Sequence, residues 1–95
     1  MVLNLQMIHI RETFPDENTT ALWVDGRLDR ETLLLLKNIY HRHLKKGKRI
    51  LLDFEGLLHL CKEGEDFLKE IRGRAILLNI PEFLKLQIAN DKAED

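Results

Sequence analysis

Two short apolar runs constrain the fold of this chain more than any other feature of its sequence. Residues 49–54 read RILLDF and residues 74–80 read RAILLNI, and both runs are almost continuously apolar. This pattern is typical of buried strands in parallel sheets, whereas half-exposed strands alternate between apolar and polar residues. The segment between the runs, residues 63–72, has its apolar residues at helical spacing. A strand, a helix and a second strand in this order predict a parallel β-α-β unit.

The N-terminal half predicts an antiparallel pair of strands. Residues 2–11 and 19–25 are rich in Val, Leu, Ile and other strand-forming residues, and both have the character of strands. Pro15, Asp16 and Asn18 lie between them and favour a turn. Because the connection is short, the two strands should pair antiparallel.

A long helix should follow, from about Arg30 to Lys46. Asp29 is a good N-cap, since its carboxylate can accept a hydrogen bond from the backbone N–H of Thr32. Gly47 suits the left-handed residue just beyond the helix. Pro81 suits the first position of a last helix, where its missing N–H costs nothing.

These elements predict a single α/β domain over residues 1–95, in the order β-β-α-β-α-β-α. We expect a mixed sheet of about four strands, with right-handed crossovers that place the helices mainly on one face. Residues 1–18 provide the N-terminal strand and turn, and residues 89–95 form a polar tail.

Alternation along the strands leaves an apolar patch on the other face of the sheet. If most apolar residues of these strands, including Ile76 and Leu78, face the helices, then Trp23, Leu51 and Leu77 point away from them. Water should not cover three large apolar side chains in the middle of adjacent strands. Either the N-terminal segment covers this patch, or another protein or a second copy of the chain does. The second possibility predicts an apolar interface and a homodimer.

Composition argues against several functional classes. The 95 residues carry 15 Lys and Arg against 16 Asp and Glu, a net charge of −1, so no global charge attracts nucleic acid. The basic run from His41 to Arg49 lies at a predicted helix end, where cations offset the macrodipole. Cys61 is the only cysteine, which excludes an intrachain disulfide and favours a reducing compartment. With no signal peptide and no apolar run long enough to span a bilayer, we expect a cytoplasmic protein without membrane insertion.

Two segments resemble the STAS domain, which is the anti-sigma factor antagonist family. Residues 24–29, VDGRLD, are similar to the V-x-G-x-L-D motif that opens the first helix of that family. Residues 53–64, DFEGLLHLCKEG, are similar to its central D-L-S-G-V-x-x-I-D-S-S-G segment, without gaps. The resemblance covers roughly residues 19–88 and includes the order of the elements.

This resemblance implies a bacterial signal-transduction domain that regulates transcription by binding proteins and performs no catalysis. The implied partners are an anti-sigma factor or kinase-like protein, or a transporter ATPase. In the family, phosphorylation of the first serine of D-S-S-G switches binding by adding negative charge. Lys62 occupies that position here, Cys61 replaces the preceding Asp, Glu63 replaces the second serine, and only Gly64 matches. The chain contains no serine, so we expect a degenerate member without this switch.

We therefore predict a non-catalytic interaction domain that needs no cofactor. The expected partner-binding loop consists of Asp25, Gly26, Cys61, Lys62, Glu63 and Gly64.

The alternative is a thiol-based redox sensor or enzyme centred on Cys61, because a helix N-terminus favours a thiolate. A metal site is not expected. His59 with Cys61, or His41 with His43, would supply only two of the four ligands of a structural zinc site.

Overall fold

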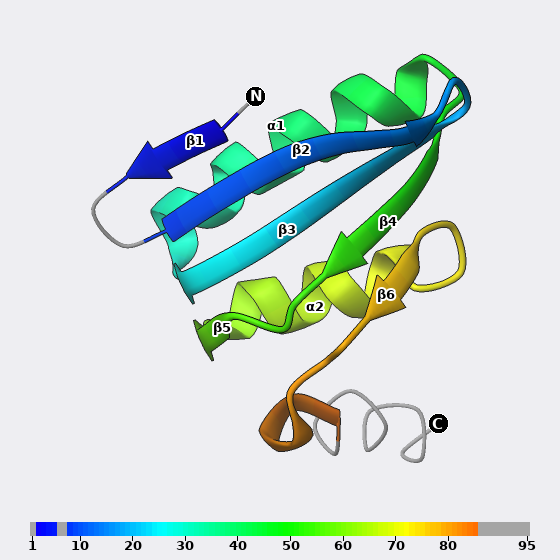
Figure 1. Cartoon of the computed structure of the whole chain (residues 1–95). Coiled ribbons are helices and arrows are strands. Elements are labelled where there is room, and N and C mark those ends of the chain that lie inside the picture. Colours follow the sequence, from blue (N-terminus) through cyan, green and yellow to red (C-terminus); the bar gives the residue numbers. More distant parts are fainter. Residues whose placement is uncertain (1, 6–7, 86–95) are drawn as a thin grey trace.

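The computed structural model of the chain describes residues 2–5 and 8–85, with side chains from residue 8 onward (Figure 1). Six strands and two helices follow one another, and a helical turn over residues 82–85 ends the described part. The bounds are β1 Val2–Leu5, β2 Ile8–Asp16, β3 Thr19–Leu28, α1 Arg30–Lys45, β4 Arg49–Asp53, β5 Leu57–Leu60, α2 Lys62–Ile71 and β6 Ile76–Leu78.

β3 is the central strand of a mixed sheet whose main order is β1-β2-β3-β4-β6. β2 pairs antiparallel with β3, and β4 pairs parallel with the first half of β3, as far as Trp23 opposite Asp53. β5 continues beyond the end of β4 and pairs parallel with the last residues of β3, Gly26–Leu28. The ten residues of β3 therefore pair with three other strands, β2, β4 and β5.

Both helices pack on the same face of the sheet, and the hydrophobic core lies between them and the sheet. In Figure 1, α1 lies behind β2 and β3, and α2 lies behind β4 and β6. Leu22 and Leu52, from neighbouring strands, are fully buried on this face. Burial of each such side chain is worth roughly 1.5–3 kcal/mol. Tyr40 of α1 meets Phe67 of α2 edge to face, with ring centroids 5.6 Å apart, so the helices also pack against each other.

The predicted fold class is confirmed, because the chain forms an α/β domain with a mixed sheet and helices on one face. Asp29 caps α1 as expected, and its carboxylate accepts a 3.0 Å hydrogen bond from the backbone N–H of Thr32. Gly47 has a φ of +74° just beyond the helix, as expected. Within residues 2–5 and 8–85, no helix is both long enough and apolar enough to cross a membrane.

The sheet has two more strands than predicted. The single strand expected over residues 2–11 is divided into β1 and β2, and β2 continues to Asp16 through the predicted turn. Its pairing with β3 shifts between Thr13 and Asp16, where Pro15 has no N–H to donate. Residues 57–60, expected as a loop, form the additional strand β5.

The prediction that Leu77 shares a face with Trp23 and Leu51 is wrong. Leu77 pairs with Leu52 of β4, so it points toward the helices and packs against the core. Ile76 and Leu78, expected to face the helices, lie on the opposite face and are 45% and 38% exposed. The error is one residue of register in β6, and because side chains alternate along a strand, such a shift exchanges the faces.

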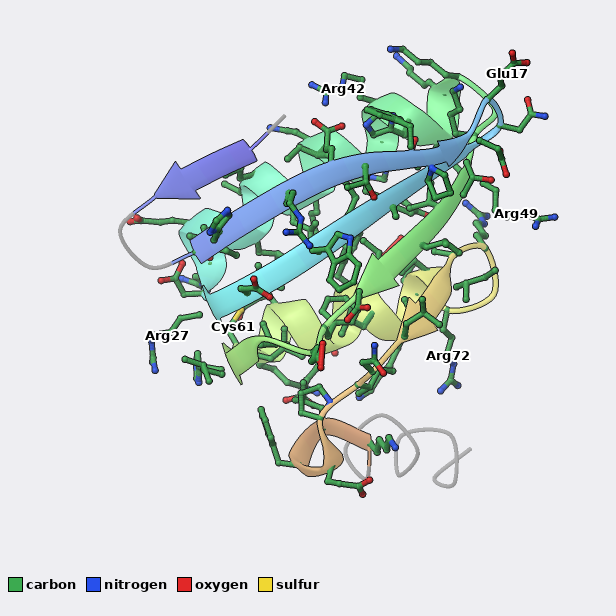
Figure 2. All side chains as sticks on the ribbon, viewed as in Figure 1. Glu17, Arg27, Arg42, Arg49, Cys61 and Arg72 are labelled. Carbon is green, nitrogen blue, oxygen red and sulfur yellow. The ribbon has the colours of Figure 1, made fainter. Side chains whose placement is uncertain are left out.

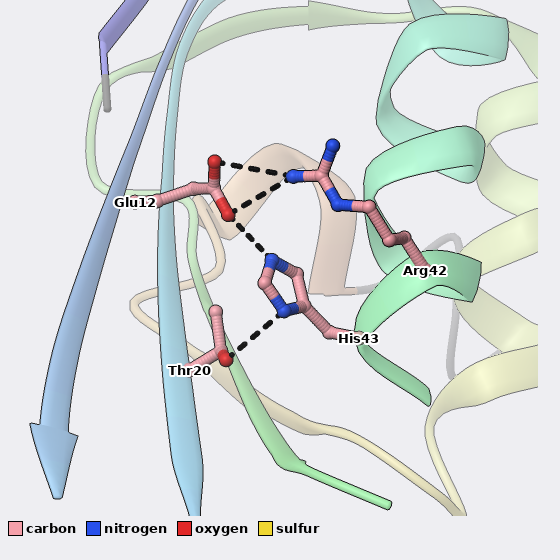
Figure 3. Close-up of polar contacts among 4 residues, drawn as sticks. All are labelled: Glu12, Thr20, Arg42 and His43. Atoms are coloured by element: carbon pink, nitrogen blue, oxygen red, sulfur yellow. Dashed lines mark hydrogen bonds and ion pairs between the residues drawn. The ribbon is translucent and has the colours of Figure 1, made fainter. Parts of the chain in front are cut away.

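A buried polar network joins β2, β3 and α1 (Figure 3). The Glu12 carboxylate pairs with Nε2 of His43, and the two side chains are 4% and 6% exposed. Arg42 donates to both carboxylate oxygens of Glu12 at 3.3 Å. The Thr20 hydroxyl lies 3.3 Å from Nδ1 of His43. The network fixes the C-terminal half of α1 against the outer part of the sheet.

We predict that Glu12→Ala destabilises the fold strongly, because it leaves His43 buried without its carboxylate partner. Leaving a buried polar group without its hydrogen-bond partner costs about 1–3 kcal/mol. The matched control is Glu17→Ala, which removes an exposed carboxylate from the adjacent turn. Urea denaturation followed by circular dichroism measures the unfolding free energy of both variants. Equal unfolding free energies for the two variants would contradict the importance of the network.

Candidate functional site

The two segments that carry the family resemblance meet at the carboxyl end of β3. We call this region the tip and define it as residues 24–29, 53–57 and 60–64. The backbone N–H of Gly26 donates to the carbonyl of Gly56 at 2.9 Å, and the N–H of Cys61 donates to the carbonyl of Leu28 at 3.0 Å. The carboxyl ends of parallel strands are where α/β domains usually bind their ligands.

Gly56 allows the first two segments of the tip to approach each other. A Cβ atom at this position would lie 2.6 Å from Cγ and 3.0 Å from Cβ of Asp25. Gly26, its hydrogen-bond partner, has a φ of +100°, which L-residues rarely adopt. The two glycines therefore make possible both the close contact and the pairing of β5 with β3.

The run from Cys61 to Gly64 forms the N-cap and first turn of α2, which begins at Lys62, one residue before the predicted start at residue 63. Cys61 is the N-cap of α2, and its Sγ accepts a 3.3 Å hydrogen bond from the N–H of Gly64. A Cβ atom on Gly64 would lie 2.5 Å from Cδ1 of Leu60, so the first turn of α2 packs closely on the end of β5. Lys62 is exposed and forms an ion pair of 3.3 Å with Asp66 on the next turn.

An ion pair joins the beginnings of the two helices at the tip. Nε of Arg30 donates to Oε2 of Glu63 at 2.8 Å. This hydrogen bond is the main reason that the pKa of Glu63 lies below its ordinary value of 4.5. A lowered pKa means that the pair stabilises the fold at pH values above the ordinary pKa of the carboxyl, and that this contribution is lost as the pH falls and Glu63 is protonated. Both side chains are exposed, so salt screens the pair.

A shallow groove runs between the helices beside this ion pair. It encloses about 240 Å³ and is lined by Arg30, Leu33, Leu34, Lys37 and Glu63. Leu34 is 63% exposed at its edge, whereas Leu33 is buried at its base. An exposed leucine beside charged side chains is suited to contact with another protein.

A larger hollow of about 460 Å³ lies at the opposite end of β3, along the turn between β2 and β3. Its lining includes Asp16, Asn18 and Arg49. The Asp16 carboxylate already accepts a 2.8 Å hydrogen bond from the N–H of Asn18, which lowers its pKa. This hollow is the solvent-exposed side of a turn whose polar groups already hydrogen-bond to one another. We therefore take the smaller groove beside the tip as the candidate site.

The residues of the tip include no serine, threonine or tyrosine. The nearest hydroxyl in sequence, on Thr32, accepts a hydrogen bond from the N–H of Asp29 and donates to the carbonyl of Arg27. Within the described part of the chain, no cluster of three or more His, Cys, Asp or Glu side chains could hold a metal ion.

The structure brings the predicted site residues together only in part. Asp25 and Gly26 contact Gly56, whereas Cys61 contacts the end of β3 at Leu28. Figure 2 shows Cys61 close to the end of β3, with Arg27 pointing away from it into solvent.

Sequence analysis missed the residues that α1 contributes to the site. Arg30, Leu34 and Lys37 recur at intervals of three and four residues, so they lie on one side of α1. An exposed leucine within such a charged stripe is the signal that could have identified them.

A scan against protein-family models finds no match for this chain, and a search of curated proteins finds no significant match. The structure assigns the chain to the small α/β domains with a mixed sheet.

We predict that Gly56→Ala destabilises the protein by about 1–3 kcal/mol, the usual cost of overpacking. The added methyl group would overlap with the Asp25 side chain. Gly73→Ala is the matched control, because a Cβ atom there meets nothing within 4 Å. Thermal unfolding compares the two variants, and adding Asp25→Ala to Gly56→Ala should recover part of the loss. If both glycine variants have the same stability, the close contact does not shape the tip.

Proposed function

We propose that this chain is a STAS-type protein-interaction domain that binds its partner through the tip and the adjoining groove. The observation that carries the proposal is the contact between the two motif-bearing segments. Gly26 and Gly56 are 30 positions apart in the sequence, yet the N–H of Gly26 donates to the carbonyl of Gly56 at 2.9 Å. The same contact places both segments beside the N-terminus of α2.

The chemistry of the groove indicates what the partner presents. Leu34 offers an exposed apolar contact, and Arg30 and Glu63 flank it with both signs of charge. A partner would place an apolar side chain against Leu34 and polar groups against the ion pair. An anti-sigma factor or kinase-like protein is the partner class that the family resemblance favours, and a transporter ATPase is the second.

Binding in this proposal is not switched by phosphorylation at the tip. Lys62 stands where the family has its modified serine, and the nearby Glu63 holds a fixed charge that Arg30 already neutralises in part. The domain therefore acts in a permanently binding-competent form, and control rests on its concentration or on its partner.

A thiol-based function of Cys61 remains the second candidate, because its Sγ accepts a hydrogen bond at the N-terminus of α2. Reactive cysteines are often found at helix N-termini. Alkylation with iodoacetamide separates the candidates. Rapid reaction near neutral pH supports a sensor, whereas slow reaction with an ordinary pH dependence supports the interaction domain.

The direct test is to capture the partner from native cells with the tagged full chain and then to measure its affinity for two variants. Leu34→Glu should weaken binding at least about tenfold, since it places a charge in the apolar part of the interface. Ile76→Glu is the control, because this residue is 45% exposed on the opposite face of the sheet.

Two outcomes would contradict the proposal. One is equal affinity of the captured protein for wild type and Leu34→Glu. The other is phosphate on any residue of the tip after incubation with the captured protein.

A further inference from the structure

The face of the sheet that points away from the helices has no cover among the described elements. Figure 1 looks onto this face. The N-terminal strand was one candidate cover, but β1 pairs with the edge of β2 and extends the sheet sideways. No described helix crosses in front of β3, β4 or β6.

This uncovered face has an apolar centre. The strand registers place Trp23 of β3, Leu51 of β4, and Ile76 and Leu78 of β6 on it. Trp23 and Leu51 are half-buried, and the two β6 residues are 45% and 38% exposed. A contiguous apolar surface of this kind, over three adjacent strands, marks an interaction site.

Charges on the two sides of the centre have opposite signs. On the β2 side, Arg11 is paired in register with Trp23, and its guanidinium lies 4.9 Å from the centroid of the indole ring. On the β4 side, Asp53 is the register partner of Trp23, but its carboxylate is buried and accepts hydrogen bonds from the Asn79 side chain and the backbone N–H of Glu55. The exposed Glu55, which follows it, supplies the negative charge on this side. The positive charge, Trp23 and the negative charge therefore form a row across the sheet. A twofold rotation reverses this row, so the positive end of one copy meets the negative end of the other.

We propose that this face binds a second copy of the chain. A twofold axis parallel to the strands and near Trp23 places the β4–β6 side of one copy over the β2 side of the other. Arg11 of each copy then lies on the side of its partner that carries Glu55, and the apolar centres meet. Two sheets packed face to face in this way keep their strands roughly aligned, about 10 Å apart.

The size of the face sets the expected strength of the dimer. Four strands with only a few outward side chains each make a patch smaller than the roughly 800 Å² per partner of a standard interface. The dimer should therefore be weak, exchanging and dependent on concentration. It leaves the groove free, since the groove lies between the helices, so it does not rest on the proposed function.

Two measurements on the full chain test this proposal. Sedimentation velocity should show mass increasing from monomer toward dimer as the concentration rises. Trp23 is the only tryptophan, so its emission should shift to shorter wavelength over the same concentration range as the interface excludes water. A chain that stays monomeric at millimolar concentration overturns the proposal.

Variants test the surface and its orientation, with circular dichroism confirming that each one folds. Ile76→Glu and Arg11→Glu should each weaken the dimer at least about tenfold. The double variant Arg11→Glu/Glu55→Lys exchanges the two charges and should recover most of the affinity lost by Arg11→Glu. Leu34→Glu, at an exposed apolar site on α1, should dimerise like wild type. A dimer unaffected by the first two variants, or no recovery in the double variant, overturns the proposal.

Discussion

The pairing of β3 with three other strands is the constraint on which the rest of this structure depends. Its antiparallel partner β2 and its parallel partner β4 fix the sheet, and β5 uses the length of β3 that β4 leaves open. The parallel pairing requires a crossover on one side, and α1 provides it, so the helices collect on one face. The same pairing leaves the other face without a helix.

This asymmetry gives the molecule two different surfaces. On the helix side and at the end of β3, backbone hydrogen bonds hold the tip, and the groove beside it carries the exposed Leu34. On the opposite side, apolar residues of three strands surround Trp23. A partner protein in the groove and a second copy on the opposite face would contact different side chains. A tip already ordered before binding also avoids the entropic cost of folding a loop on the partner.

Most of the fold was predictable because hydrophobic periodicity decides it. The continuous apolar run at residues 49–54, the cap at Asp29 and the glycine at Gly47 each marked an element correctly. The pattern could not decide the register of β6, since alternation along three residues with leucine or isoleucine at each position is satisfied on either face. It also missed β5, whose pairing depends on a close contact between two glycines distant in sequence.

The polar contacts were harder to predict, because they too depend on which elements pack together. Glu12 follows Ile8 and Ile10 at strand spacing and thus occupies a core-facing position. The predicted strand ended at Arg11, which placed Glu12 in the turn, and only the helix packed opposite brings His43 to it. The candidate site was likewise predicted only in part. Sequence identified the segments of the tip, whereas the contribution of α1 appeared only once Arg30 and Glu63 were found in contact.

Residue-resolved amide hydrogen exchange tests the central claim, that the tip is a rigid extension of β3, most directly. The diagnostic amides are those of Gly26 and Cys61, which donate to Gly56 at 2.9 Å and to Leu28 at 3.0 Å. We predict that both exchange as slowly as the centre of β3, through opening of the whole domain. If they exchange at the rate of an unprotected loop while the centre of β3 stays protected, the tip is not preorganised and the account is wrong.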